Sequence, residues 1–392
     1  MMKKLRVGIV GVGNIGTAHA NSILSGDIKN TELTAVCDTA VSRAGFFKKN
    51  YPGIKFYDSY EKMLSSAQID AVIIATPHKY HADMAMQALK HNMNVLVEKP
   101  VDIRVSKAKE LNSTAKEKNK IFAIMFNQRT NPLFKSAKEI VAGGGIGELK
   151  RTVWIVTNWY RTQKYYDSGG WRATWSGEGG GVLLNQAPHN LDLWQWICGM
   201  PESVTAFCNI GKYHNIEVED DATILTRYKN GATGVFMTST GEYPGTNRLE
   251  ISGDSGKMVL ENGTLKLYKL KEPVSKAIRD SDFGYAQIDY DYEEIKQNAP
   301  ESSHKGILQN FANAVLSGEE LIAPGTEGIN ELTISNAAYL SEWQGNREIH
   351  LPFDIALFDE LLANKVKSSK YKPADGGEND SMSYLPRWQV KW

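Results

Sequence analysis

The chain has little cysteine, no excess of either charge and no long apolar run. Its three cysteines, Cys37, Cys198 and Cys208, lie far apart and without metal-ligand spacing, so we expect reduced, buried thiols in a cytoplasmic protein. Lysine plus arginine equals aspartate plus glutamate at 45 each, which favours neither nucleic acid nor a membrane surface as a partner. No stretch approaches the ~18 apolar residues of a membrane span. With 392 residues, 42% of them hydrophobic, the chain is expected to form two globular domains.

The N-terminus shares two features with a signal peptide. Lys3 and Lys4 precede an apolar stretch, and Ala18-His19-Ala20 resembles a cleavage site. Arg6 and Asn14 interrupt the apolar segment, however. We therefore interpret it as the first strand of a folded domain.

A glycine-rich turn follows this strand. The apolar run at 7–10 is followed by Gly11, Gly13 and Gly16, in the pattern G-x-G-x-x-G, where the sequence becomes helical. The first glycine allows a tight turn, the second lets the backbone approach a pyrophosphate, and the third lets the helix pack closely on the sheet. The helix N-terminus adds free N–H groups for the phosphates. The loop residues expected to contact a dinucleotide are Gly11, Gly13, Asn14, Ile15 and Gly16.

An acidic residue stands at the expected distance from this turn. The apolar run at 33–37 ends in Asp38, about 20 residues after the last glycine, where a dinucleotide fold places the acid that accepts from the ribose 2′-OH. A carboxylate there repels a 2′-phosphate, so we expect NAD rather than NADP, although Arg43 lies nearby. The alternative is an α/β domain with a glycine turn and no nucleotide.

The first third of the chain alternates apolar runs with helical patterns. The runs are 5–10, 33–37, 70–75, 93–97 and 121–125, and the helical patterns lie near 14–25, 41–49, 59–66, 79–91 and 104–118. This alternation predicts an α/β class domain with a doubly wound parallel sheet. Thr76-Pro77-His78 and Glu98-Lys99-Pro100 follow two of the strands, at the sheet edge where ligands bind.

The pattern changes after a helix expected at about 132–143. Residues 149–159 alternate in character, and Asn230-Gly231 and Asn262-Gly263 each separate two strand-like runs, as in hairpins with type I′ turns. We expect a second α/β domain with a large, mostly antiparallel open sheet and helices on one face. Helical patterns return at 304–317 and 328–344, before a strand-like run at 349–352. The predicted domains are 1–126, 127–352 and a C-terminal arm, 353–392, docked in part through Trp388 and Trp392.

Two stretches carry most of the chemical signal. Lys99 would enter a partly desolvated cleft, aimed by a cis Pro100, although a lysine that closes a strand is usually solvated. In the second stretch, Pro188 suits the first turn of a helix, which places His189 on that turn and Asp192 three residues later on nearly the same face. A lone histidine is usually a satisfied core residue. Its position after Gly179-Gly-Gly and Asn185 favours a functional role.

Together these motifs resemble the Gfo/Idh/MocA family, which includes glucose–fructose oxidoreductase and inositol dehydrogenase. The resemblance covers roughly residues 5–352 and depends on an ordered set: Gly-Val-Gly-Asn-Ile-Gly, Ala-Thr-Pro-His, Glu-Lys-Pro, Asn127-Gln-Arg129, Gly-Gly-Gly and Asn-Gln-Ala-Pro-His. It implies a Rossmann domain, a second domain whose open sheet forms a homodimer or homotetramer, and an NAD(P)-dependent dehydrogenase acting on a sugar or cyclitol hydroxyl.

The resemblance also assigns roles to single residues. Lys99 matches the lysine thought to hold the reacting oxygen, and His189 matches the general acid/base. Asn185 falls where many members carry an aspartate that orients this histidine. Asparagine can hold a tautomer but cannot stabilise an imidazolium as a carboxylate does, and Asp192 is the alternative partner.

The segment 158–172 mixes aromatic rings with arginine, as suits a polyol. Tyr165 and Tyr166 fit a core or an interface equally well. His78 and His81 lack further ligands, so no metal site is expected, and helix capping is their alternative role. The expected cofactor contacts outside the glycine turn are Asp38, Thr76, Pro77, His78, His81, Glu98, Lys99, Asn127, Arg129, Trp171 and Arg172. The expected substrate contacts are Lys99, Tyr160, Arg161, Asn185 and His189.

Three functions remain open. The first is hydride transfer from a sugar or cyclitol carbon to nicotinamide, with His189 as acid/base. The second is glycoside cleavage through a transient keto-sugar, for which the aromatic segment could hold a disaccharide. The third is a cofactor-sensing regulator, suggested by Asn185 in place of an acid.

Overall fold

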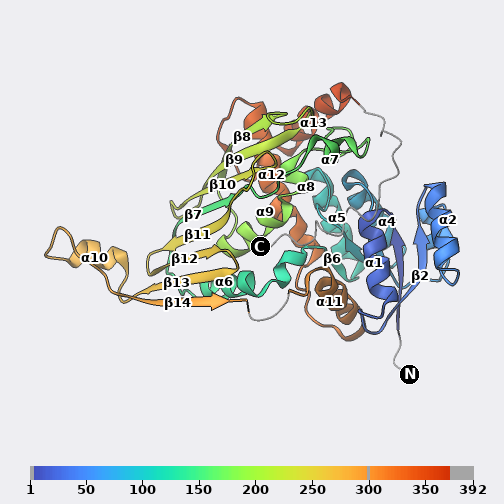
Figure 1. The fold of residues 1–392 in the computed structure, drawn as a ribbon, viewed down its shortest axis with the longest axis horizontal. Helices are drawn as coiled ribbons and strands as arrows, with labels where there is room; N and C mark the ends of the chain where they lie inside the picture. Colours follow the sequence, from blue (N-terminus) through green and yellow to red (C-terminus); the bar gives the residue numbers. More distant parts are fainter. Residues whose placement is uncertain (1–3, 298–300, 371–392) are drawn as a thin grey trace. The chain divides into compact units, whose positions relative to one another are not determined.

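The computed structural model describes residues 4–297 and 301–370, which fold as two compact units (Figure 1). The first unit combines Met1–Thr130 with Ser302–Leu332, and the second combines Asn131–Glu301 with Thr333–Trp392. Residues 302–332 had been assigned from the sequence to the second domain, but they complete the first unit. The division between the units falls within one helix, α12 (Gly328–Trp343).

The first unit is built on a six-stranded parallel sheet with the order β3-β2-β1-β4-β5-β6. Its strands are β1 (Leu5–Val10), β2 (Thr31–Cys37), β3 (Lys55–Tyr57), β4 (Ala71–Ile74), β5 (Asn94–Val97) and β6 (Phe122–Ile124). The central strands β4 and β1 are almost entirely buried, as expected for apolar runs covered on both faces. The doubly wound sheet predicted from the sequence is confirmed, with β3 as an additional short strand at one edge.

Helices from both chain segments belong to this unit. They are α1 (Asn14–Leu24), α2 (Val41–Asn50), α3 (Tyr60–Leu64), α4 (His81–Lys90), α5 (Val105–Lys118) and α11 (Ser303–Ser317), with the 3-10 turns η1 (His78–Tyr80), η2 (Asn127–Thr130) and η3 (Gly325–Glu327). The later segment joins the sheet directly, because the Ile124 N–H donates to the Ala323 carbonyl at 3.1 Å. The first unit is therefore incomplete without residues 302–332.

The second unit contains a nine-stranded sheet with the order β14-β13-β12-β11-β7-β10-β9-β8-β15. The strands are β7 (Leu149–Val156), β8 (Ser203–Ile210), β9 (Glu219–Arg227), β10 (Thr233–Ser239), β11 (Asn247–Gly253), β12 (Gly256–Glu261), β13 (Thr264–Leu270), β14 (Tyr290–Lys296) and β15 (Ile349–His350). All neighbouring pairs are antiparallel except β7 and β10. The sheet is therefore mixed and mostly antiparallel, as predicted.

One face of this sheet packs on helices. They are α6 (Pro132–Ala142), α9 (Pro188–Cys198) and α12, and the unit also contains α7 (Gln163–Asp167) and α8 (Val182–Asn185). Trp194 of α9 stacks on Phe236 of β10 with ring centroids 5.5 Å apart, and Phe134 of α6 lies 5.8 Å from Trp154 of β7. These rings are fully buried and form the centre of the core.

The two predicted hairpins form, but their turns differ. Asn262 and Gly263 both have positive φ, +50° and +69°, as a type I′ turn requires. In the other hairpin only Gly231 has positive φ, and the Gly231 N–H donates to the Tyr228 carbonyl at 2.8 Å. That turn is therefore not type I′, because its connection is longer than two residues.

The first part of the predicted C-terminal arm forms a helix. Residues Ile355–Ser368 form the helix α13, capped by the Asp354 carboxylate, which accepts from the Leu357 N–H at 3.0 Å. Phe358 stacks on Trp343 of α12 at 5.4 Å, so this helix belongs to the core of the second unit. The predicted docking residues Trp388 and Trp392 lie outside the described residues.

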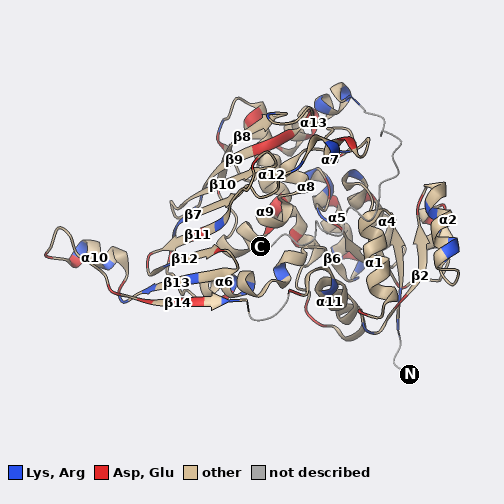
Figure 2. Cartoon of the chain, in the orientation of Figure 1, with Lys and Arg blue, Asp and Glu red and all other residues tan. Residues whose placement is uncertain are grey.

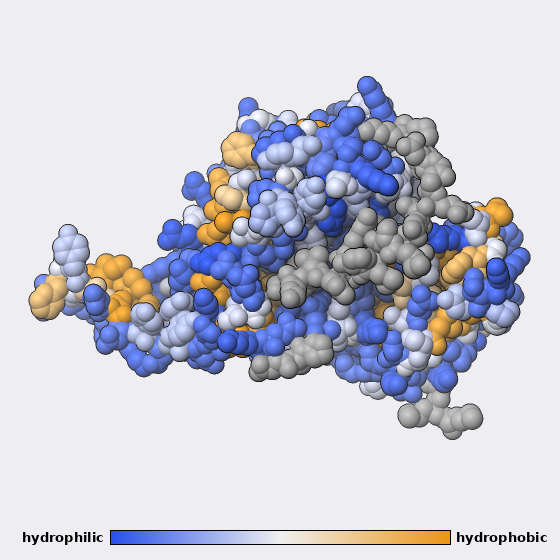
Figure 3. All heavy atoms as spheres, viewed as in Figure 1, coloured by the Kyte–Doolittle hydropathy of each residue, from blue (hydrophilic) through white to orange (hydrophobic). Residues whose placement is uncertain are grey.

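Apolar side chains are exposed around α10 (Val274–Asp280), between β13 and β14 (Figure 3). Ile278, Phe283 and Tyr285 are at least three-quarters exposed. None of the helices in the part of the chain that the structure describes combines the length and apolar character needed to cross a membrane.

Candidate active site

The glycine turn leaves an open space at its middle glycine. Gly11 has φ +83°, and a Cβ there would lie 2.6 Å from the Ala75 carbonyl oxygen. A Cβ on Gly16 would lie 2.0 Å from the Gly11 oxygen, so this glycine permits close packing of α1. Gly13, the N-cap of α1, has no heavy atom within 4 Å of its Cβ position among the residues considered. The turn fits a pyrophosphate at the helix N-terminus.

Asp38 also fits a dinucleotide. It follows β2, and its Oδ2 accepts from the Val12 N–H at 2.9 Å while Oδ1 accepts from the Ala40 N–H at 2.9 Å. The carboxylate thus supports the glycine turn, and each of its oxygens keeps a lone pair for a ribose hydroxyl. The residues at this edge can hold NAD.

The ends of β4 and β5 are joined by a buried histidine. His81 is 1% exposed, and its Nε2 and Nδ1 each lie 2.7 Å from a carbonyl oxygen, of Thr76 and of Pro100 respectively. Burial lowers the pKa of His81, while the two carbonyls oppose this effect. A neutral ring has one N–H, so only the protonated ring could donate to both oxygens. His81 therefore lies between the two expected cofactor turns, Thr76-Pro77-His78 and Glu98-Lys99-Pro100, and in its neutral form it donates to one of them.

Glu98 anchors the backbone of the next residue. Its Oε1 lies 2.7 Å from Nε2 of His19, and its Oε2 accepts from the Lys99 N–H at 3.3 Å. Burial raises the pKa of Glu98, but the hydrogen bond and charge of His19, with smaller effects of His304 and Lys99, lower it to about 2. Burial also lowers the pKa of His304 to about 4. The Lys99–Pro100 peptide is cis, as expected.

Two expected cofactor residues, Asn127 and Arg129, have partners in residues 302–332. Arg129 is 1% exposed, and its guanidinium pairs with the Glu327 carboxylate and lies 5.2 Å from the Phe126 ring centroid. The Asn127 amide donates to the Ser303 hydroxyl at 2.9 Å. These contacts give Arg129 and Asn127 a structural role that the sequence did not indicate.

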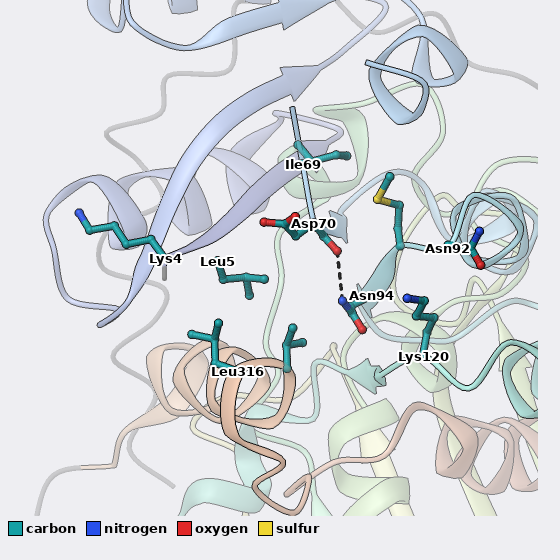
Figure 4. A pocket seen from close by; sticks show the side chains of 10 residues that line it. Lys4, Leu5, Ile69, Asp70, Asn92, Asn94, Lys120 and Leu316 are labelled. Carbon is teal, nitrogen blue, oxygen red and sulfur yellow. Dashed lines mark hydrogen bonds between the residues drawn. The ribbon is translucent and has the colours of Figure 1, made fainter. Parts of the chain in front are cut away.

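A pocket of the first unit lies at the edge of the parallel sheet opposite to the glycine turn (Figure 4). It has a volume of about 360 Å³ and includes Lys4, Asp70, Asn94 and Lys120 at the beginnings of the strands or just before them. The Asn94 amide donates to the Asp70 carbonyl at 3.1 Å. Ligands of doubly wound sheets bind at the carboxyl ends of the strands, so this pocket is not the expected cofactor site.

In the second unit, an aromatic segment follows β7. Arg172 donates to the Tyr165 hydroxyl at 3.0 Å, and its guanidinium lies 4.6 Å from the Trp171 ring centroid. Gln186 also donates to the Tyr165 hydroxyl, at 3.3 Å. The structure thus joins the aromatic segment to the residues that follow Asn185.

The outer part of this segment is more exposed. Tyr160 is 46% exposed and meets Tyr243, which is 82% exposed, with ring centroids 5.6 Å apart. The Arg161 guanidinium donates to the Trp159 and Tyr160 carbonyls and lies 5.2 Å from the Tyr165 ring centroid. Tyr166 is buried and bonds to Thr240, so it belongs to the core.

A buried glutamate explains two of the three consecutive glycines. A Cβ on Gly181 would lie 1.9 Å from the Glu219 carbonyl oxygen, and one on Gly180 would lie 2.2 Å from the Tyr339 hydroxyl. The Glu219 carboxylate, which is fully buried, accepts from the Gly181 and Leu183 N–H groups and from the Tyr339 hydroxyl, at 2.7–3.1 Å. Glu219 begins the acidic run of β9, red in Figure 2. The glycines therefore allow α8 to pack on β9, beyond any role toward a ligand.

Asn185 ends α8 and pairs with Glu178 through its side-chain amide. The helix α9 begins three residues later with Pro188 at its first position, as predicted, so His189 lies on its first turn. Both Asn185 and His189 are partly exposed, whereas Asp192 is 1% exposed and accepts from Gln195 at 3.1 Å. Sequence reasoning missed Glu178 and Glu219, because no motif marks them.

Cys37, Cys198 and Cys208 are free thiols. Burial raises the pKa of Cys37 and of Cys198 to about 12, which makes these thiols unreactive. No group of three or more potential metal ligands occurs among the described residues.

Both units match models of the same protein family. Residues 5–126 match the family model "Oxidoreductase family, NAD-binding Rossmann fold", and residues 134–259 match "GFO/IDH/MocA C-terminal domain". Myo-inositol 2-dehydrogenase of Thermotoga maritima is 25% identical over 342 residues, 85% of this chain and 95% of that protein. The WlbA dehydrogenase of Bordetella pertussis, crystallised with NADH and UDP-GlcNAcA, is 27% identical, with a TM-score of 0.73 and coverage of 90% of this chain and 100% of that chain. Levoglucosan dehydrogenase with NADH and levoglucosan shares the fold at 18% identity, a TM-score of 0.75 and coverage of 89% and 100%.

Proposed function

Because the chain belongs to the GFO/IDH/MocA family of NAD-binding oxidoreductases, we propose that it transfers hydride between a sugar or cyclitol carbinol carbon and NAD, with His189 as general acid/base and Lys99 holding the reacting oxygen. The main support is the construction of one sheet edge in the first unit. The open Gly13, the Asp38 carboxylate and the anchored Lys99 follow β1, β2 and β5, which are strands of one parallel sheet.

The proposed roles of Lys99 and His189 follow from the chemistry of their side chains. A bound NAD, held by the glycine turn and Asp38, would supply the nicotinamide ring as hydride acceptor. In the oxidative direction a ring nitrogen of His189 takes the hydroxyl proton, while the Lys99 ammonium donates to the same oxygen and stabilises its developing negative charge. Asn185 ends α8 and lies four residues before His189, which is on the first turn of α9, and we assign it the part of orienting the ring. The reverse direction uses the same groups, with His189 as the acid.

The test is a spectrophotometric screen. Inositols, aldoses, uronates and glycosides are offered with NAD⁺, and formation of the reduced cofactor is followed. We expect turnover with at least one polyol, a loss of about a thousandfold in kcat for His189→Ala, and nearly unchanged cofactor affinity for that variant. Cofactor binding without turnover of any polyol would overturn the assignment of a dehydrogenase substrate.

A second candidate function uses the exposed Tyr160–Tyr243 pair. Two exposed rings near Arg161 suit stacking on a second sugar, so the substrate would be a disaccharide or another glycoside. A ketone formed at one carbon acidifies the adjacent C–H, so that loss of this proton expels the glycosidic oxygen. Water would then add to the resulting enone, and return of the hydride from the reduced cofactor to the ketone would restore the alcohol and the oxidised cofactor. Release of the leaving group without accumulation of reduced cofactor, weakened by Tyr243→Ala, would support this function over simple oxidation.

We also propose that the open face of the second sheet forms a homodimer or homotetramer. Phe207, Leu225 and Met237 project from β8, β9 and β10 on the face away from the helices, and they are 37–49% exposed. Sedimentation should show that Leu225→Glu weakens assembly while Phe283→Glu, in the segment that follows α10, does not. The reverse result would assign the contact to the α10 segment.

The three free thiols support a reducing compartment, and we propose the cytoplasm. Expression with a secretion signal should then bring no gain in stability. Formation of a stabilising disulfide in an oxidising compartment would contradict this proposal.

A further inference from the structure

Glu178 is a buried carboxylate next to the proposed acid/base segment. Glu178 is 1% exposed, and its Oε2 accepts from the Ala173 N–H at 2.7 Å. Its Oε1 accepts from the side-chain amide of Asn185. Both oxygens thus meet N–H donors, which is the pattern that an ionised carboxylate satisfies.

The turn that carries Glu178 is tightly built. The Thr174 hydroxyl donates to the Trp171 carbonyl at 2.9 Å and accepts from the Gly177 N–H at 3.0 Å. A Cβ on Gly177 would lie 2.3 Å from the Trp171 oxygen, so only glycine fits there. The Glu178 N–H itself donates to the Thr174 carbonyl at 2.9 Å. This scaffold fixes the carboxylate independently of α8.

The bond to Glu178 determines how the Asn185 amide is oriented. A carboxylate can only accept, so the NH₂ side of Asn185 must face Glu178 and its Oδ1 must point elsewhere. Asn185 is the last residue of α8 and lies four residues before His189, on the first turn of α9. An outward carbonyl oxygen at this position suits an imidazole N–H as its partner.

We propose that Glu178 and Asn185 act as one positioning pair for His189. Glu178 supplies the negative charge and fixes the orientation of the Asn185 amide, and this amide in turn orients the His189 ring. This inference rests on the proposed role of His189. An imidazole that gains a proton during the reaction is stabilised by a nearby anion, and a neutral asparagine cannot provide one. Position 185 carries no charge in this sequence, and the negative charge lies instead on Glu178, which accepts from the Asn185 amide.

The hydrogen-bond pattern predicts how exchanges will behave. In Glu178→Gln the new NH₂ meets the Asn185 NH₂, so the Asn185 amide must turn over and present a donor on its outer side. In Asn185→Asp two carboxylates face each other and share a proton. In the double variant Glu178→Gln/Asn185→Asp every donor again meets an acceptor, with the charge moved to position 185.

The experiment compares these three variants with Glu217→Gln as a matched control. The Glu217 N–H donates to the Ala173 carbonyl at 3.4 Å, and its carboxylate contacts Ser369 and Lys370 rather than Asn185. Selective ¹⁵N labelling of histidine, without cofactor, reports the tautomer and titration midpoint of the His189 ring. Steady-state kinetics on the best polyol and thermal unfolding are measured in parallel.

Each single variant should change the His189 tautomer and lower kcat by about 100-fold, with a small effect on KM and on cofactor affinity. Glu178→Gln should also lower the titration midpoint of the ring by about one unit, as expected for loss of one nearby charge. The double variant should restore the tautomer and return kcat to within about tenfold of the parent.

The outcomes separate this inference from the proposed function. If the parent turns over no polyol but the ring signals change and recover as described, the pair stands and the assigned reaction fails. If turnover is present and the ring signals and kcat of the singles match those of Glu217→Gln, the pair is refuted. Equal loss of thermal stability in the singles and the double, with no recovery of kcat, would also refute it, because Glu178 would then only support the turn.

Discussion

Replacing Glu219 with glutamine tests whether a buried carboxylate makes the second unit sensitive to pH. Burial raises the pKa of Glu219 to about 7, against the opposing effect of the donors Leu183, Tyr339 and Gly181. A carboxyl group whose pKa is higher in the folded than in the unfolded state binds more protons when folded. Its contribution to stability is therefore fully present at low pH, and it is lost as the pH rises from about 4.5 to about 7.

The expected size follows from the shift. A difference of about 2.5 units corresponds to roughly 3 kcal/mol at most, of which about 2–3 kcal/mol falls between pH 5 and pH 8. Glutamine does not titrate and can offer only one oxygen to the donors, so Glu219→Gln should be destabilised at both pH values. The loss relative to the parent should be larger at pH 5, where the parent still has most of the contribution of Glu219.

Urea unfolding of the second unit, followed by tryptophan fluorescence at pH 5 and pH 8, measures both losses. Glu293→Gln is the control, because this glutamate side chain is 58% exposed on β14. A larger loss at pH 8 than at pH 5 would refute the reasoning. It would mean that the three donors outweigh burial and that Glu219 is more acidic in the folded protein.

Three further predictions concern the glycines and Asp38. Gly13→Ala should keep the unfolding temperature of the parent but reduce NAD affinity, measured by calorimetry, at least about tenfold. Gly16→Ala should instead unfold the first unit, because its Cβ would lie 2.0 Å from a backbone oxygen. Equal stability of the two variants would contradict this. Asp38→Asn should reduce the ratio of kcat/KM for NAD over NADP by about 30-fold and also raise the KM for NAD, since Asp38 supports the glycine turn; an unchanged ratio would assign the selectivity elsewhere. Gly181→Ala should destabilise the second unit by about 3 kcal/mol or more in urea unfolding, and a loss below about 1 kcal/mol would show that α8 can move away from β9.

Local patterns were sufficient for the first sheet and for the order of its motifs. The five predicted strands of the first unit form within two residues of their expected bounds, because continuous apolar runs between glycine and proline signals are typical of buried parallel strands. β3 has three residues, and β14 is polar and exposed on both faces, so neither offers a clear pattern. The helix α13 did have signals, an Asp354 cap and spaced apolar residues, but the lysines near its end favoured an arm.

Candidate site residues could be proposed from the sequence where they stand in short motifs, but their remote partners could not. The glycine turn, Asp38, Lys99 and His189 stand in short motifs. The bonds from Glu219 to Tyr339 and from Arg129 to Glu327 join residues more than 100 positions apart. Sequence patterns identify which residues can be partners, but only the fold decides which ones meet.

The first unit is assembled from two separated chain segments, and this has a consequence for synthesis. Its sheet emerges from the ribosome early, but α11 and η3 follow only after Asn131–Glu301 have been made. At about 5–20 residues per second this interval lasts roughly 10–30 s, during which Arg129 and Phe122 lack the segment that covers them. Nascent chains should therefore rely on chaperones at this stage, and a fragment ending at Thr130 should be prone to aggregation although it contains every strand of the dinucleotide-binding sheet.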